Sequence, residues 1–165
     1  MGLNIHYFDH TSAPARDEFP DTRWGTEDWH EDRYALMDHT GFGLSYSIFN
    51  DLRTWIVEQA GLETASDPTG RKTPAMWKDD DPGTDYEGNW TREPEDPIAY
   101  LIQHSDCDGH IEPEHAGLIA ERLKGLEIDA TDEKGVVDPF YPTWLAKLIE
   151  ICETAAATNR RLEFR

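Results

Sequence analysis

Basic residues are scarce in this chain. Its 165 residues hold 15 Lys and Arg against 34 Asp and Glu, a formal net charge of −19. No Lys or Arg cluster exceeds Asn-Arg-Arg (159–161), so nucleic-acid backbones and anionic membranes repel the chain, and we expect neither as a direct partner. One alternative is a basic protein partner, which the acidic chain would bind by mimicking nucleic acid. Acidic residues more often simply form a solvated surface.

Cysteines and long apolar runs are also few. Cys107 and Cys152 cannot build a disulfide framework, and the apolar stretches are far shorter than a membrane span. No charged-then-apolar leader precedes Met-Gly-Leu-Asn-Ile-His. We therefore expect a cytoplasmic protein, folded as a single domain over 1–165 that is long enough to bury a core without disulfide cross-links.

The apolar pattern predicts strands near both ends of the chain. Residues 2–8 alternate, and alternation returns at 161–165. Apolar spacing and capping residues predict helices at 45–61, 96–102, 113–125 and 141–159. We expect an α+β fold in which about four helices pack on a small sheet that joins the N- and C-terminal strands. For the first helix, the predicted buried face consists of Ile48, Leu52, Trp55, Ile56 and Gln59.

Two stretches between these elements lack periodicity. A long, partly irregular connection is expected after residue 9, and residues 63–95 are rich in Pro and Gly, which predicts a long irregular surface loop. Trp77, Tyr86 and Trp90 lie in that loop, and aromatic rings need a surface to pack on. The loop should fold over the core as a lid or bring those rings to a ligand. The two roles are compatible.

The run His-Ser-Asp-Cys-Asp-Gly-His (104–110) resembles part of an EF-hand calcium loop. Aligning Gly109 with the invariant sixth position puts four residues at oxygen-ligand positions: Asp106, Asp108, His110 through its carbonyl group, and Glu112. These four are the candidate metal ligands, and a divalent ion such as calcium is the candidate cofactor. The alternative is that the protein has no cofactor.

The ends of this loop fit calcium poorly. His104 and His115 stand where calcium needs carboxylates, so calcium binding should be weak. Zinc or another transition ion is a second possibility, because histidines and a cysteine are close by, although the spacing fits no zinc pattern. A third is a turn without metal, in which Asp106 and Asp108 accept backbone amides.

Two motifs together carry a family resemblance. The loop at 104–109, the Ser-Tyr-Ser-Ile-Phe-Asn-Asp-Leu-Arg segment at 45–53 and the two terminal strands resemble a group of small uncharacterised bacterial and bacteriophage proteins. That group usually has Glu where this chain has His110, and often an acid in place of His115. The resemblance implies that the two motifs act together. Its bacteriophage members imply sequestration of a host signalling nucleotide, a form of anti-defence activity.

A ligand site is accordingly predicted from both motifs. The start of the 45–61 helix offers free amides and a positive dipole end to an anionic group. The 104–108 motif offers acceptors for hydroxyls or an amine, and tryptophans offer rings for a base. The predicted ligand-binding residues are Ser45, Tyr46, Ser47, Arg53, Trp77, Trp90, His104, Ser105, Asp106 and Asp108. Each also has a structural alternative, such as helix capping, core packing or ion pairing.

No catalytic signature is complete. The chain has no nucleophile elbow, His-Glu-x-x-His, phosphate loop or Gly-x-Gly-x-x-Gly. We therefore expect first a non-catalytic protein that binds a small, nucleotide-like ligand. A weak divalent-metal protein or metal-dependent enzyme ranks second, and an acidic protein-interaction or nucleic-acid-mimic inhibitor third. A homo-oligomer is compatible with each of these three functions.

Overall fold

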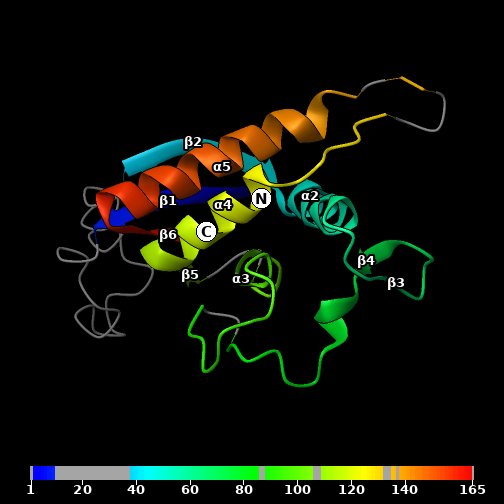
Figure 1. The fold of residues 1–165 in the computed structure, drawn as a ribbon, viewed down its shortest axis with the longest axis horizontal. Helices are drawn as coiled ribbons and strands as arrows, with labels where there is room; N and C mark the ends of the chain where they lie inside the picture. Colours follow the sequence, from blue (N-terminus) through cyan, green and yellow to red (C-terminus); the bar gives the residue numbers. More distant parts are fainter. Residues whose placement is uncertain are drawn as a thin grey trace.

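The computed structural model describes residues 2–9, 38–85, 88–105, 109–131, 135–136 and 138–164. Within these ranges the strands are β1 (Gly2–Asp9), β2 (Asp38–Ser45), β3 (Thr64–Ser66), β4 (Lys72–Pro74), β5 (His110–Ile111) and β6 (Arg160–Phe164). The helices are α2 (Tyr46–Gln59), α3 (Ala99–Ile102), α4 (Pro113–Lys124), α5 (Phe140–Thr158) and a 3-10 helix, η3 (Ala75–Lys78). The predicted α+β fold is confirmed (Figure 1).

The main sheet joins the first and last strands. Its order in the described residues is β2-β1-β6-β5, and every neighbouring pair is antiparallel. Ile5 of β1 lies opposite Phe164 of β6, and Ile111 of β5 lies opposite Leu162. These four side chains are buried, because the alternation of the strands turns them all to the same face. The short strand β5 is thereby held at the edge of the sheet.

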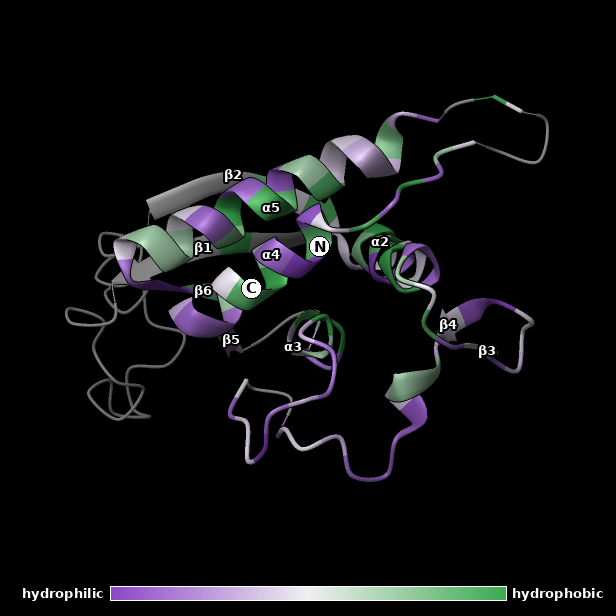
Figure 2. Ribbon diagram, in the orientation of Figure 1, coloured by the Kyte–Doolittle hydropathy of each residue, from purple (hydrophilic) through white to green (hydrophobic). Residues whose placement is uncertain are grey.

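Helices α4 and α5 lie side by side across this sheet (Figure 1). Both predicted helices are confirmed, and each buries an apolar face: Ile119 and Leu123 of α4 and Leu148 and Ile151 of α5 are all buried. Figure 2 shows these helices hydrophobic on some faces and hydrophilic on others, as expected for helices that bury one side. No helix of the described residues combines the length and apolar character that crossing a bilayer requires.

Helix α2 begins where the sequence predicts, and the predicted buried face is confirmed at Leu52 and Ile56 but wrong at Ile48. Ser45 caps the helix by accepting a hydrogen bond from the amide of Ile48 at 3.3 Å. The Ile48 side chain is 36% exposed, whereas Phe49 is fully buried. The Phe49 ring packs 5.9 Å from the ring of Phe164, so contact with the sheet rotates the helix relative to its apolar stripe.

Several elements, namely β2, the β3–β4 hairpin, η3 and β5, were not predicted. Strand β2 contains Gly41 and Gly43, which weaken any strand signal. The 63–95 segment contains the hairpin β3–β4 and η3, so only part of it is the irregular loop expected from the sequence. Its later part is mostly hydrophilic and runs beside α3 (Figure 2). The connection between β1 and β2 (10–37) and Tyr86 lie outside the described residues.

Candidate ligand pocket

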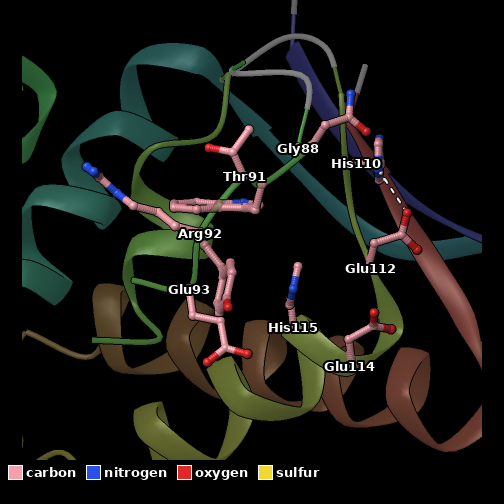
Figure 3. A pocket seen from close by; sticks show the side chains of 11 residues that line it. Gly88, Thr91, Arg92, Glu93, His110, Glu112, Glu114 and His115 are labelled. Atoms are coloured by element: carbon pink, nitrogen blue, oxygen red, sulfur yellow. Dashed lines mark ion pairs between the residues drawn. The ribbon is translucent and has the colours of Figure 1, made fainter. Parts of the chain in front are cut away.

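A pocket of about 440 Å³ opens between the 88–93 segment, α3, β5 and the start of α4 (Figure 3). The described residues that line it are Gly88, Asn89, Trp90, Thr91, Arg92, Glu93, Tyr100, His110, Glu112, Glu114 and His115. Because these residues come from separate parts of the chain, the pocket exists only in the folded protein.

Local hydrogen bonds hold the two walls in place. In one wall, Trp90 forms a β-bridge with Thr84, and the amide of Thr91 donates to the carbonyl of Gly83 at 2.9 Å. In the other, β6 holds β5, and α4 begins at Pro113, so the chain turns sharply after Glu112. That turn places the residues on either side of Pro113 at the pocket.

Three aromatic rings that line the pocket contact one another. The Tyr100 ring stacks on the imidazole of His115, with centroids 3.9 Å apart and planes at 10°. The Trp90 ring meets Tyr100 edge to face at 4.8 Å. Tyr100 is buried, whereas Trp90 and His115 are partly exposed and therefore reachable from the pocket. We call these three residues the ring platform.

The ring platform is uncharged at neutral pH. Burial raises the pKa of the Tyr100 phenol, and the negative charges of Glu93 and Glu114 add to the rise. Burial lowers the pKa of His115, and the charges of Glu114 and Glu112 oppose this lowering only in part. Neutral rings with electron-rich faces therefore line the pocket.

Carboxylates surround the ring platform. Glu112 pairs with His110, whose Nε2 lies 3.0 Å from Glu112 Oε1. Glu93 and Glu114 are exposed and form no ion pair within the described residues. Arg92 extends away from the His110 and Glu112 pair (Figure 3), and its guanidinium lies 3.2 Å from the carboxylate of Asp81. The described lining therefore carries more negative than positive charge near the rings.

Of the residues predicted to bind a ligand or a metal, Trp90, His110 and Glu112 line this pocket. The pairing of His110 with Glu112 gives two adjacent candidate ligands for a metal. Asp106 and Asp108, the other two predicted ligands, lie outside the described residues. Among the residues that the structure does describe, no three His, Cys, Asp or Glu side chains are grouped for a metal ion. A divalent cofactor stays a prediction.

Arg53 does not lie at the start of α2. It is 3% exposed, and its guanidinium donates to the carbonyls of Ile102 at 3.3 Å and His104 at 2.6 Å. The guanidinium also lies over the ring of Trp77, 5.0 Å from its centroid, while the Trp77 indole donates to Ile102. Arg53 and Trp77 therefore tie α2 and η3 to the C-terminal end of α3.

At the start of α2 the structure does not assemble the predicted anion site around Arg53. Ser45 is occupied as the helix cap, Ser47 is exposed 3.1 Å from the Ser45 hydroxyl, and Tyr46 packs partly buried against the core. The cation at this position is Arg71, which donates to the carbonyl of Ser47 at 3.3 Å and pairs with Asp51. Sequence spacing missed Arg71 because it arrives from the β3–β4 hairpin.

His104 and Ser105 lie in or beside the core. His104 is 4% exposed, its ring lies 4.2 Å from that of Phe164, and its Nδ1 donates to the carbonyl of Ser105 at 2.6 Å. Burial lowers the pKa of His104 to about 4. This histidine is therefore neutral under ordinary conditions and contributes to packing. Neither His104 nor Ser105 is among the described residues that line the pocket.

Sequence reasoning missed several pocket residues, chiefly Glu93, Tyr100, Glu114 and His115. The predicted helix start at Pro113 is a signal that could have placed Glu114 and His115 beside Glu112. No local pattern marks Glu93 or Tyr100, because their role depends on contacts between separate segments.

The chain matches no family model, no curated protein and no solved structure.

Proposed function

We propose that the protein binds a small polar molecule in the pocket between the 88–93 segment and α4, without transforming it. The observation that carries the proposal is the ring platform of Trp90, Tyr100 and His115 with carboxylates around it. Apolar rings with a few convergent polar groups are typical of small-molecule sites, and a volume of about 440 Å³ suits such a ligand.

Binding without chemistry agrees with the reactive groups of the described residues. Cys152 is fully buried, and burial raises the pKa of its thiol to about 12, so it is no nucleophile at neutral pH. His110 is paired with Glu112, and His115 is stacked on Tyr100, which gives both imidazoles a structural partner.

The nucleotide-like ligand expected from the sequence stays a prediction. A base would stack on the exposed part of Trp90, and ribose hydroxyls would donate to the carboxylates of Glu93 or Glu114. Phosphate groups would meet those same carboxylates, and Arg92 is turned toward Asp81. Within the nucleotide class, we therefore propose that a nucleoside binds more tightly than its phosphate.

The proposal is tested by NMR titration of the full chain with a library of polar fragments that includes adenosine and AMP. Binding should shift the amide resonances of residues 88–93 and 110–115. The blocking variant Asn89→Trp, which adds bulk at an exposed lining position, should abolish these shifts. Thr69→Trp, at an exposed position on the β3–β4 hairpin, is the matched control. A library without pocket hits, or hits that Asn89→Trp leaves unchanged, would refute the proposal.

A further inference from the structure

We infer that the pocket selects an organic cation, such as a small molecule with an alkylammonium or trimethylammonium group, over neutral and anionic ligands. This inference rests on the proposed function and adds the chemical class of the ligand. It combines three features of the pocket: the nature of the rings, the carboxylates in both walls and the position of Arg92.

The rings suit a cation because their faces carry partial negative charge. A cation within about 6 Å of an aromatic centroid is attracted to the face of the ring, most strongly for Trp. Trp90 lines the pocket with part of its surface exposed. Its edge contact with Tyr100 fixes the indole without using both of its faces. A trimethylammonium group would also gain from burying its methyl groups against this ring.

Carboxylates line both walls of the pocket: Glu93 belongs to the 88–93 segment, and Glu114 to the start of α4. Glu93 and Glu114 both raise the pKa of Tyr100, and they join Glu112 in opposing the lowering of the His115 pKa. Their negative charges are therefore felt at the ring platform itself. Because Glu93 and Glu114 have no ion-pair partner among the described residues, both are available to a ligand cation.

The chain does not neutralise this charge with its own basic side chain. The described lining contains one basic side chain of the Lys or Arg type, that of Arg92. Arg92 donates to the carboxylate and to the backbone carbonyl of Asp81. Figure 3 shows its side chain leading away from Glu112 and His115. The net charge of −19 adds a long-range attraction for cations, which raises their rate of capture.

Two exposed carboxylates and one cation–π contact should together favour a cation over a neutral molecule of the same shape by about ten- to a hundredfold. The preference should shrink as salt rises, because exposed charges are screened over about 10 Å at 0.1 M salt. A preference that came only from ring stacking would not depend on salt.

The test uses pairs of similar shape in which one member is a cation and the other is neutral. Choline is compared with its neutral carbon isostere 3,3-dimethylbutan-1-ol, and benzylamine with benzyl alcohol, by NMR titration of the full chain. Each cation should bind about tenfold or more tightly than its neutral partner, with shifts at residues 88–93 and 110–115. The double variant Glu93→Gln with Glu114→Gln should reduce the preference by about threefold or more, because only the attraction of the rings remains. The control Glu121→Gln with Glu127→Gln makes the same change in net charge at other exposed positions and should keep it.

The outcomes separate this inference from the proposed function. If the neutral molecules bind the pocket as tightly as the cations, cation selection is wrong and ligand binding stands. The same conclusion follows if only nucleosides or other fragments bind there. If the control pair of glutamines weakens the cations as much as the pocket pair does, the attraction is a general surface effect and the inference is wrong. If no probe or fragment binds the pocket, the proposed function fails with it.

Discussion

A Cβ atom at Gly88 would lie 1.9 Å from the carbonyl oxygen of His110, so the backbones of the 88–93 segment and β5 are in direct contact. Gly88 also has a φ of +104°, which residues with side chains rarely adopt. The two walls of the pocket meet at this contact, and no side chain fits between them. Gly88 therefore sets the width of the pocket at that end.

Gly88→Ala should lower the free energy of unfolding by about 2–4 kcal/mol, because it adds both strain in φ and a clash with backbone. Gly70→Ala is the control, since Gly70 has a φ of +83° but nothing within 4 Å of a Cβ, and should cost about 1 kcal/mol. Urea unfolding followed by tryptophan fluorescence measures both. Equal losses would mean that the Gly88 contact with His110 is not a constraint.

Arg53→Ala should lower the free energy of unfolding by about 2–4 kcal/mol, because it leaves the buried carbonyls of Ile102 and His104 without this donor. Arg71→Ala removes an exposed ion pair with Asp51 and should cost less than about 1 kcal/mol. Both variants replace an arginine by alanine. The difference between their urea midpoints therefore measures how much more a buried arginine contributes to stability than an exposed one. A smaller loss for Arg53→Ala than for Arg71→Ala would contradict the structural role of Arg53.

Acid should destabilise the fold through His104. Its pKa is about 4 in the folded protein and about 6.5 when unfolded, so between these values the unfolded chain binds a proton that the folded protein excludes. The stability is therefore fully present above pH 6.5 and falls by up to about 3 kcal/mol as the pH drops to 4. Arg53 and His110, which act on His104 electrostatically, lower its pKa further.

His104→Gln should flatten this pH dependence, measured as the change in unfolding free energy between pH 6.5 and 4.5. Ile119→Val is the control, because it removes volume from the core and leaves every titratable group in place. It should lower stability by a similar amount at each pH. A slope that is unchanged in His104→Gln would assign the acid sensitivity to other groups.

Ser45→Ala should destabilise the fold by about 1 kcal/mol, since Ser45 caps α2 through the amide of Ile48. Ser45→Asp should keep most of the stability, because Asp is an equally good capping residue. Ser47→Ala, which removes only a hydroxyl contact at an exposed position, should have a smaller effect. Thermal unfolding by circular dichroism ranks the three variants. A loss for Ser45→Asp as large as that for Ser45→Ala would rule out the cap.

Much of the fold could be predicted from the sequence because its signals are local. Ser45, Pro113 and Gly125 mark helix ends through hydrogen bonds and dihedral limits that involve a few neighbouring residues. The apolar stripes of α4 and α5 repeat every three or four residues, and alternation marks the terminal strands. Together these signals determine the α+β class and the four helices confirmed in the described residues.

Only the tertiary structure decided that α2 buries Phe49 rather than Ile48, and where Arg53 is placed. The periodicity that favours Ile48 over Phe49 is weak, and the contact of Phe49 with Phe164 outweighs it. Arg53 belongs to a motif that predicts an anion site, yet its guanidinium binds carbonyls some fifty residues further along the chain. Such contacts leave no trace in local spacing.

The pocket, too, was determined partly by the sequence and partly by the tertiary structure. The sequence by itself marked Trp90, His110 and Glu112 as residues with chemistry to offer, because tryptophan, histidine and glutamate stack, ligate and accept in any setting. The stacking of Tyr100 on His115 and the approach of Gly88 to His110 depend on which segments of the chain pack together in the folded protein. The sequence therefore determined the kinds of groups available, and packing between distant segments decided which of them share one pocket.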